Sequence, residues 1–468
     1  MAVFAAVLSG RFALAQAPAP APAAPPGSTA EEMPPAPAVE DPMLSPVPPP
    51  HRFIASWDEA ERLLRARSTD LRSAYDDIRR AEADSRTALA AVLPTLSASG
   101  TATHTILDLP KRSSVSVIDQ AGNLTNTSGG SNSYSASLRA SIALVNVQAW
   151  HQIGTAHASE DVARLSYQDL ERTTAAGLAT AIAQNVTAER VSELSRVGLR
   201  NALERLALTQ AKERTGTATG LDIVRARQDV ASARSSLVSS DEALRKSRES
   251  LGLAVGYTDP IGVLPSTDLS SIERSALKSC HPVPDLEHRP DVLAASKNVE
   301  VARRRATEVD LGFLPTLSAG STLGTSVTDS SNSEAHTTWN VQAILSVPIW
   351  DGGARYGARR SAAAAADQSA TSLEALRRNS TVGLAQVRRS VDVADESRRV
   401  AQESRDLAYE VDRLTRLAYQ TGKGTSLDLV TSAAALRQAE VNLALAELGL
   451  VQARLDNLLT LANCSVAR

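Results

Sequence analysis

Two stretches of the chain carry the pattern of very long helices. Val147–Glu213 and Gly353–Gln420 contain no proline, and each run of about 67 residues predicts one helix of roughly 100 Å. A short polar break follows each run, and then a return helix of about 35 residues in which apolar side chains recur every seven positions. This spacing predicts coiled-coil-like packing. The repeated positions are Ile223, Val230, Leu237, Leu244 and Leu251 in the first return helix, and Leu429, Leu436, Leu443 and Leu450 in the second.

A period of two marks the strand candidates. Ser137–Leu144 and Asn340–Val347 alternate apolar and polar side chains, so each strand is predicted to have one apolar and one polar face. Arg139 lies on the polar face of the first. Thr95–Ile106 and Thr316–Thr328, rich in Ser, Thr and small residues, are weaker candidates for two further strands.

A helix is predicted before each pair of strands. The first, Ser56–Val92, opens with a capping box in which Ser56 is the N-cap and Glu59 is N3. The second is Arg289–Gly312. Because the return helices are too short to cover the long ones, we expect these two helices to stack end to end with them and cover the remainder.

The sequence contains an internal repeat with a period of about 200 residues. LPTLSA occurs at Leu93–Ala98 and at Leu314–Ala319, and TGTATGLDIV at Thr215–Val224 matches TGKGTSLDLV at Thr421–Val430. We interpret residues 51–256 and 289–462 as two copies of one half-protein, joined by residues 257–288. The first copy has about fifteen extra residues around Asp119–Ser133, which composition predicts to be a surface loop.

The two ends of the chain differ from the repeats. Residues 1–17 are mostly apolar and contain Ala13-Leu14-Ala15, which predicts an export signal; the alternative is a disordered Ala-rich tail. Thirteen of the 22 prolines lie between Pro18 and Pro50, so residues 18–50 are predicted to be a disordered Pro-rich linker. Residues 463–468 form a short C-terminal tail.

Composition argues against several classes of protein. A formal net charge of −3 gives no strong bias toward nucleic acid, and 3% aromatic residues is low for a globular enzyme. No catalytic cluster is recognisable, so an enzyme is not expected and no cofactor is implied. Cys280-His281 with His288 fits no common zinc spacing, and no metal site is expected.

The apolar runs bear on membrane passage. No run of about 18 uncharged apolar residues exists, so any passage through a membrane is expected to use strands. Strands in lipid must close into a barrel, and four are too few, so several chains would have to pool theirs. The alternative is two small soluble sheets that cap a coiled coil.

The order of these features resembles the TolC-type outer-membrane efflux protein family. The resemblance runs from about Phe53 to Leu461. It is carried by the doubled LPTLSA, by Arg289-Pro290-Asp291-Val292, by Pro348-Ile349-Trp350-Asp351-Gly352-Gly353, and by two G-x-x-x-x-L-D turns at Gly216–Asp222 and Gly422–Asp428.

The resemblance implies a fold and a function. The fold would be mainly α with a small β part: a homotrimer with a twelve-stranded outer-membrane β-barrel, four strands per chain, that continues into a long α-helical periplasmic barrel. The function would be that of a passive exit duct in a tripartite efflux or type I secretion system. Its partners would be a periplasmic adaptor protein, an inner-membrane transporter of the RND or ABC type, and outer-membrane lipid, with no nucleic acid. The alternative is a cytoplasmic coiled-coil scaffold without channel activity.

The resemblance also implies site residues at the periplasmic tip. Asp428, Asp222 and Lys423 would lie at the pore aperture, where three copies of Asp428 would form a carboxylate ring. The alternative for both aspartates is simple stabilisation of a helix N-terminus. Some family members carry an arginine at the position of Gly424 and a second acid at that of Thr431, so a gate closed by those ion pairs is not expected. The turns expected to contact the adaptor contain Gly216, Thr217, Leu221, Gly422, Gly424 and Leu427.

The two cysteines, Cys280 and Cys464, fall in segments that the resemblance places around the middle of the helical cylinder. In an oxidising compartment they could pair, and an intrachain disulfide is the hypothesis; two free thiols are the alternative.

Overall fold

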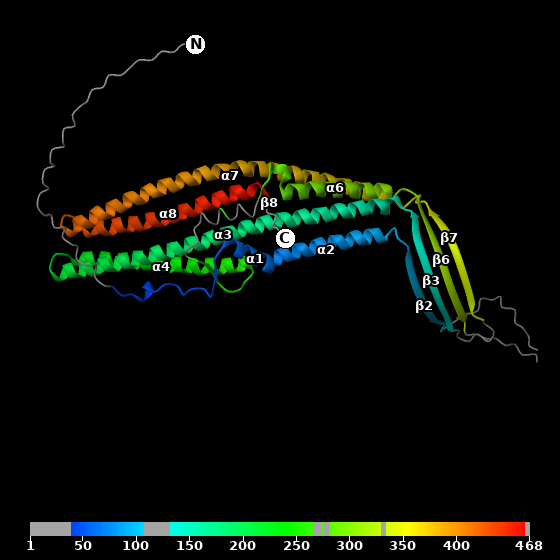
Figure 1. Ribbon diagram of the computed structural model, residues 1–468, viewed down its shortest axis with the longest axis horizontal. Helices are drawn as coiled ribbons and strands as arrows, with labels where there is room; N and C mark the ends of the chain where they lie inside the picture. Colours follow the sequence, from blue (N-terminus) through cyan, green and yellow to red (C-terminus); the bar gives the residue numbers. More distant parts are fainter. Residues whose placement is uncertain (1–38, 107–131, 265–273, 275–280, 329–333, 464–468) are drawn as a thin grey trace, which may run out of the picture. The chain divides into compact units, whose positions relative to one another are not determined.

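The structure is a computed structural model that describes residues 39–106, 132–264, 274, 281–328 and 334–463. Within these residues, long helices run side by side and lead at one end into an antiparallel sheet (Figure 1). Among them, no helix carries an apolar stretch long enough to cross a membrane.

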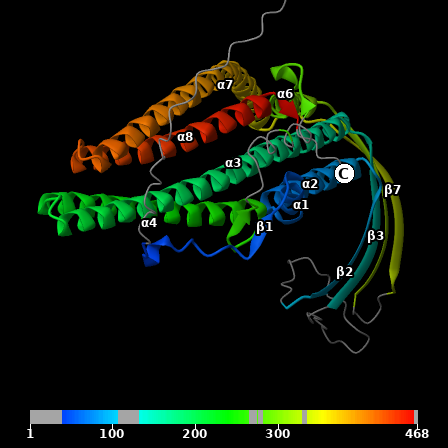
Figure 2. The ribbon, with the colours of Figure 1, turned by 60° about the vertical axis from the view of Figure 1, so that its left-hand side comes forward.

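Two helical hairpins form most of the fold. In the first, α3 (Val147–Arg214) returns as α4 (Gly220–Val255); in the second, α7 (Ala354–Gln420) returns as α8 (Ser426–Thr460). Each long helix packs along its return helix, and α8 also lies against α3, so the hairpins are neighbours (Figures 1 and 2). The two predicted long helices and both return helices are confirmed to within a few residues at each end.

The seven-residue pattern marks the packed faces of the return helices. All five of its positions on α4, from Ile223 to Leu251, are buried. On α8, Leu429, Leu443 and Leu450 are buried, and Leu436 is half-buried. The predicted coiled-coil-like packing is therefore present in both hairpins.

Shorter helices cover the rest of the long ones. α2 (Thr69–Ala90) packs against α3, and α6 (Pro290–Leu311) packs against both α3 and α7. The single helix predicted over Ser56–Val92 is wrong, because the chain forms α1 (Trp57–Arg67) and then α2. Ser68 separates them: its backbone N–H donates to the carbonyl of Leu64 (2.7 Å) while its hydroxyl caps α2 by accepting from Leu71 N–H.

Four strands form one antiparallel sheet in the order β2-β3-β6-β7. They are β2 (Thr95–His104), β3 (Asn132–Val145), β6 (Thr316–Thr328) and β7 (His336–Ser346). All four strand candidates are confirmed, and β3 starts five residues before its predicted start. The first two residues of β3 fall in Asp119–Ser133, the stretch expected to be a surface loop. Residues 107–131 and 329–333 lie outside the described residues.

The register separates the two faces of this sheet. Leu138 of β3 lies opposite Ala98 of β2 and Leu323 of β6, whereas its neighbour Arg139 lies opposite Ser97 and Thr322. Within the described residues, nothing pairs with the outer edge of β2 or of β7.

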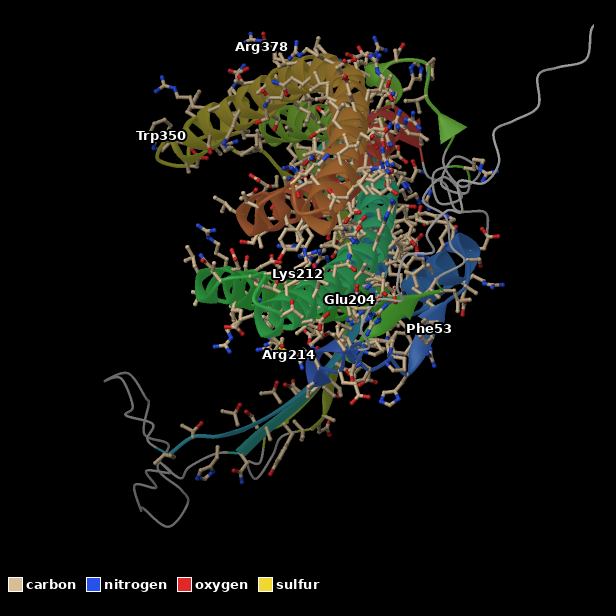
Figure 3. The ribbon with its side chains drawn as sticks, turned by 90° about the vertical axis from the view of Figure 1, so that its left-hand side faces the viewer. Phe53, Glu204, Lys212, Arg214, Trp350 and Arg378 are labelled. Atoms are coloured by element: carbon tan, nitrogen blue, oxygen red, sulfur yellow. The ribbon has the colours of Figure 1, made fainter. Side chains whose placement is uncertain are left out.

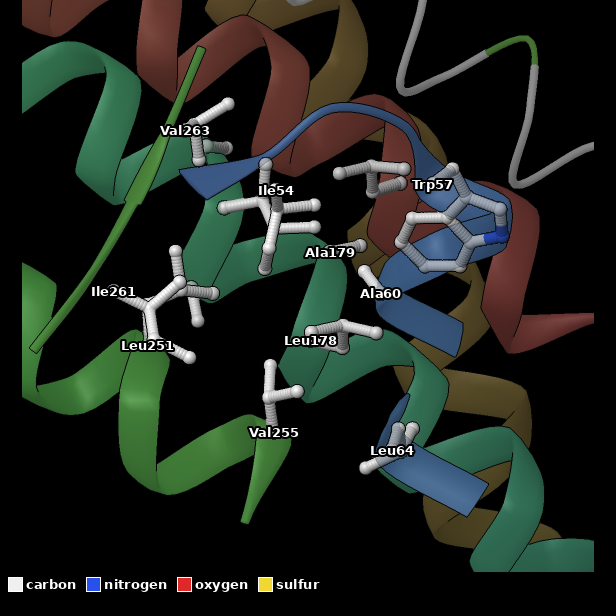
Figure 4. Close-up of a cluster of buried hydrophobic side chains, with 14 of the residues drawn as sticks. Ile54, Trp57, Ala60, Leu64, Leu178, Ala179, Leu251, Val255, Ile261 and Val263 are labelled. Atoms are coloured by element: carbon white, nitrogen blue, oxygen red, sulfur yellow. The ribbon is translucent and has the colours of Figure 1, made fainter. Parts of the chain in front are cut away.

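Two small sheets lie beside the helices. β1 (Arg52–Ile54) pairs in parallel with β4 (Ile261–Val263), and β5 (His281–Pro282) pairs antiparallel with β8 (Ala462–Asn463). A 3-10 turn, η2 (Leu286–His288), leads into α6. The largest buried cluster forms where α1, α3, the end of α4 and the β1–β4 pair meet (Figure 4). Its central side chains include Ile54, Trp57, Leu178, Leu251, Val255 and Ile261.

The chain before β1 is held against the first hairpin. Asp41 caps the 3-10 turn η1 (Pro42–Leu44), and its carboxylate forms an ion pair with Arg234 of α4 (2.6 Å). Arg248 donates to the carbonyl of Pro48 (2.8 Å). The prediction of a disordered linker over residues 18–50 therefore does not hold for residues 39–50; residues 18–38 lie outside the described residues.

Candidate functional site at the helical turns

The turn between α3 and α4 is built around one glycine. Gly216 has a φ of +73°, a left-handed conformation that lets the chain reverse after α3. Thr217 N–H then donates to the carbonyl of Lys212 (2.9 Å), which closes the end of the helix. Thr219 follows as the N-cap of α4.

The turn between α7 and α8 repeats this geometry. Gly422 also has a φ of +73°, and Lys423 N–H donates to the carbonyl of Ala418 (2.8 Å). Gly424 is closely surrounded, since a Cβ added there would lie 3.0 Å from Tyr419 N and 3.2 Å from the carbonyl carbon of Ala418. An arginine at this position would therefore require the turn to shift.

Both return helices begin with the same capping box. Asp222 N–H donates to the hydroxyl of Thr219 (3.3 Å), and the Asp222 carboxylate accepts from Thr219 N–H (2.8 Å). Asp428 and Thr425 make the matching pair of bonds at 3.1 and 3.2 Å. Each aspartate thus satisfies the start of its helix, as the helix N-terminus interpretation requires.

The second oxygen distinguishes the two aspartates. Oδ1 of Asp222 accepts a hydrogen bond from Ser426 at the start of α8 and is thereby tied to the other hairpin. Asp428 is exposed, and the hydrogen bonds it makes among the described residues stay within its own hairpin.

A lysine makes the second contact between the turns. Lys212 Nζ donates to the carbonyl of Tyr419 (2.9 Å) and lies 3.8 Å from the centre of its ring. Figure 3, viewed from the turn end, labels Lys212 on the side of the first hairpin that faces the second. Tyr419 is buried. Lys423, which the resemblance places at the pore aperture, is exposed on its turn.

The electrostatics follow these contacts. The hydrogen bond from Ser426, followed by that from Thr219 N–H, lowers the pKa of Asp222 below its ordinary value. The pKa of Asp428 is lowered chiefly by the hydroxyl of Thr425. Desolvation lowers the pKa of Lys212. At neutral pH both carboxylates are therefore anionic.

Seven residues beyond Asp222, a buried ion bridge joins the hairpins again. Asp229 of α4 accepts from Arg205 of α3 (2.7 Å) and from Arg437 of α8 (2.6 Å), and its side chain is only 1% exposed. Gly198 makes room for this bridge, because a Cβ there would lie 2.6 Å from Cδ of Arg437. Burial lowers the pKa of Arg205, and the charge of Asp229 opposes that shift.

Sequence reasoning missed this bridge and the role of Lys212. Two signals were available in the sequence: the charged residue Asp229 directly beside the heptad position Val230, and Gly198 within the proline-free run of α3. Neither identifies a partner, because Arg437 lies 208 positions away in sequence.

The predicted contact residues lie together on the two turns. Gly216, Thr217 and Gly422 are exposed and Gly424 is half-buried. Leu221 and Leu427 occupy matching positions at the starts of α4 and α8 and are 56% and 46% exposed. The turn end therefore presents two apolar side chains beside capped carboxylates.

The remaining predicted residues are the two cysteines. Cys280 and Cys464 lie outside the described residues. Their neighbours His281 and Asn463 are direct backbone partners in the β5–β8 pair. Among the described residues, no group of three or more His, Cys, Asp or Glu could hold a metal ion.

Comparisons with known proteins give consistent matches. The model of the family described as outer membrane efflux protein matches residues 62–257 and 285–462. The pyoverdine export outer membrane protein OpmQ of Pseudomonas putida is 23% identical over 300 residues, which is 63% of this chain and 63% of OpmQ. The match thus spans less than two thirds of that relative. OpmQ of Pseudomonas aeruginosa is 25% identical over 394 residues, 81% of this chain and 80% of the relative.

The fold has solved counterparts. The Campylobacter jejuni CmeC outer membrane channel superimposes with a TM-score of 0.71 at 14% identity, covering 92% of this chain and 93% of CmeC. At this identity the likeness concerns the fold.

Proposed function

The chain belongs to the outer membrane efflux protein family, and on that premise we propose that it is the exit duct of a tripartite efflux system. Three copies form a channel that passively conducts solutes from the periplasm to the exterior. The energy comes from an inner-membrane transporter, of the RND or ABC type, and a periplasmic adaptor protein joins the two. The family match over both halves of the chain is the observation that carries this proposal.

The sheet supports a shared barrel. Four antiparallel strands with free outer edges on β2 and β7 leave unpaired backbone groups, which lipid does not tolerate. Three copies joined edge to edge would supply twelve strands and leave no edge. One face of the sheet carries Leu138, Leu323, Trp339 and Val341, which suits contact with lipid.

The helices support a periplasmic duct. α3 and α7 have 68 and 67 residues, about 100 Å each, and three copies of the two hairpins side by side would enclose a long passage. The matching order of elements in the two halves supports an origin by internal duplication.

The turns form the inner end of this duct. Three copies of Asp428 would form the aperture ring, because its carboxylate is exposed and its charge is retained at neutral pH. Asp222 and Lys212 hold the two hairpins of one chain together. The exposed Leu221 and Leu427, with the glycines of the turns, are the proposed contact for the adaptor.

The cargo is proposed to be a small molecule. Two relatives bear the name pyoverdine export outer membrane protein, which favours small-molecule efflux over type I protein secretion. Secretion remains the second candidate because the same cylinder would serve it.

Membrane fractionation and bilayer recording test the proposal. The protein is expected in the outer membrane as a trimer that heating converts to monomer, and the purified trimer should form ion channels in a planar bilayer. Recovery as a soluble monomer without channels would support the coiled-coil scaffold instead.

The aperture has its own test. Asp428→Asn should reduce block of the channel by multivalent cations, because the carboxylate ring is lost. Asp222→Asn is the matched variant, and it should change the closed-state lifetime more than cation block. Equal block in wild type and Asp428→Asn would remove Asp428 from the aperture.

A further inference from the structure

The sheet carries a single permanent charge. Among the described residues of β2, β3, β6 and β7, Arg139 is the only Asp, Glu, Lys or Arg. It lies near the middle of β3, and its side chain is exposed.

No carboxylate neighbours this arginine in the sheet. Its partners across the strands are Ser97 and Thr322, and the next residue across from Thr322 is Asn340. Along β3, Ser137 and Ser141 lie on the same face. Among the described residues of the sheet, the neighbours of the guanidinium are therefore uncharged polar side chains.

The two faces of the sheet are chemically distinct at this level. One residue away, the opposite face carries Leu138, Leu323 and Trp339 in register, and Val341 two residues further along β7. An arginine facing lipid near the middle of a membrane is strongly unfavourable, whereas one facing a water-filled lumen is not. The polar face with Arg139 is thus the face that suits water.

We propose that three copies of Arg139 form a ring of positive charge in the lumen of the barrel, which makes this segment select for anionic solutes. This inference rests on the proposed trimeric duct. It names the cargo class as molecules with net negative charge, such as carboxylates. The ring stands in series with the carboxylates of the turns, so cargo meets negative charge at entry and positive charge at exit.

The expected size of the effect follows from the dimensions. Twelve strands about 4.8 Å apart and tilted by about 40° close with a backbone radius of about 12 Å. Three arginine side chains extending inward bring their charges to about 10 Å from one another, which is about one Debye length at 0.1 M salt. The positive electrostatic potential at the centre of the ring then favours anions over cations by roughly tenfold.

Reversal potentials across a planar bilayer with a KCl gradient measure this preference. The Cl⁻/K⁺ permeability ratio should fall by roughly tenfold in Arg139→Gln at 0.1 M salt, and further in Arg139→Glu. Arg139→Lys should keep the wild-type ratio. The difference between wild type and Arg139→Gln should shrink at 1 M salt, where screening is nearly complete.

Variants at neighbouring positions test the face. Asn340→Gln, on the same face and uncharged, should leave the ratio unchanged. Asn340→Arg adds a second ring of positive charge and should raise the Cl⁻/K⁺ permeability ratio. Val341→Arg places the same charge on the opposite face and should prevent stable insertion of the trimer. The heat-modifiable trimer serves as the folding check for every variant.

The outcomes separate the two proposals. Channels in wild type with equal ratios in Arg139→Gln, Arg139→Glu and Asn340→Arg would overturn the arginine ring and leave the duct intact. A folded wild-type trimer without conductance would overturn the duct and the ring with it. A lower ratio in Arg139→Gln with a normal one in Arg139→Lys supports the ring.

Discussion

The two helical turns share a sequence pattern and differ in what it contacts. Thr219–Asp222 and Thr425–Asp428 form the same capping box, with a glycine at φ +73° in each preceding turn. Oδ1 of Asp222 accepts a hydrogen bond from Ser426 of the second hairpin. Among the described residues, the hydrogen bonds of Asp428 stay within the second hairpin, to which it belongs. The repeated motif therefore determines the local turn, and the neighbouring hairpin determines what each aspartate does.

The contacts between hairpins are made where the repeats differ. At the offset of 206 that aligns the turns, Ser426 corresponds to Gly220, and Lys212 corresponds to Ala418. Asp229 and Arg437 of the buried bridge correspond to Ala435 and Ala231. The two halves of the chain thus carry different, complementary side chains at the surfaces where they meet.

The largest effect is expected from the buried bridge. Asp229→Ala leaves Arg205 and Arg437 without their carboxylate, so the free energy of unfolding should fall by about 3–5 kcal/mol. Denaturant unfolding followed by circular dichroism measures the loss. Gln228→Ala, an exposed neighbour on α4, is the control and should be nearly neutral. A loss in Asp229→Ala below about 1 kcal/mol would show that the bridge does not join the hairpins energetically.

A covalent link is expected between the segment that joins the two halves and the C-terminal tail. The β5–β8 pair places His281 opposite Asn463, so we predict a disulfide between Cys280 and Cys464 that stabilises by about 2–4 kcal/mol. Either single Cys→Ser variant should lose as much stability as the double variant, because one bond is lost in each case. Intact mass with and without reductant checks the bond directly; two free thiols in the exported protein would exclude it.

The turn contact is expected to be smaller. Ser426→Ala should cost about 1–2 kcal/mol, since it removes a hydrogen bond to a partly exposed carboxylate. A double-mutant cycle isolates the contact: Ser426→Ala with Asp222→Asn should show a coupling of at least about 0.5 kcal/mol, and Ser426→Ala with Asp428→Asn should show none. Equal coupling to both aspartates would erase the difference between the turns.

The smallest expected effect is a dependence of stability on pH. Both aspartates have a lowered pKa, so their stabilisation is complete above the ordinary value of 3.8 and is lost as the pH falls below it through the folded-state pKa. Ser426→Ala should raise the pKa of Asp222 and leave that of Asp428 unchanged. The difference between wild type and Ser426→Ala in the denaturant midpoint of unfolding should therefore be smaller at about pH 3 than at about pH 6. A constant difference would contradict a charged Asp222.

Local rules account for what the sequence predicted well. Proline-free runs and heptads located α3, α4, α7 and α8, because helix geometry depends on neighbours a few residues apart. The break at Ser68 was missed, since a serine inside a helical pattern can point outward or act as a cap. The start of β3 was predicted five residues too late. Residues 132–136 are mostly small or polar and show little alternation of apolar and polar side chains, so the period-two pattern does not reach them.

Partners distant in sequence were beyond such rules. The site residues of the turns were placed by family resemblance, and their shared capping boxes are local features. Which aspartate meets the other hairpin depends on how α8 lies against α3, and Lys212 gives no signal in its own segment that Tyr419 will receive it.

The outer edges of β2 and β7, which pair with nothing among the described residues, affect how the protein assembles. A chain that has folded but not yet met its copies exposes the open edges of β2 and β7 and an apolar face with Trp339 and Val341. Such edges readily pair with the wrong partner in water. We expect refolding yield to fall as protein concentration rises in buffer and to recover when detergent micelles or vesicles are present. Assembly of the proposed trimer would then depend on shielding these edges and this apolar face until the three chains associate.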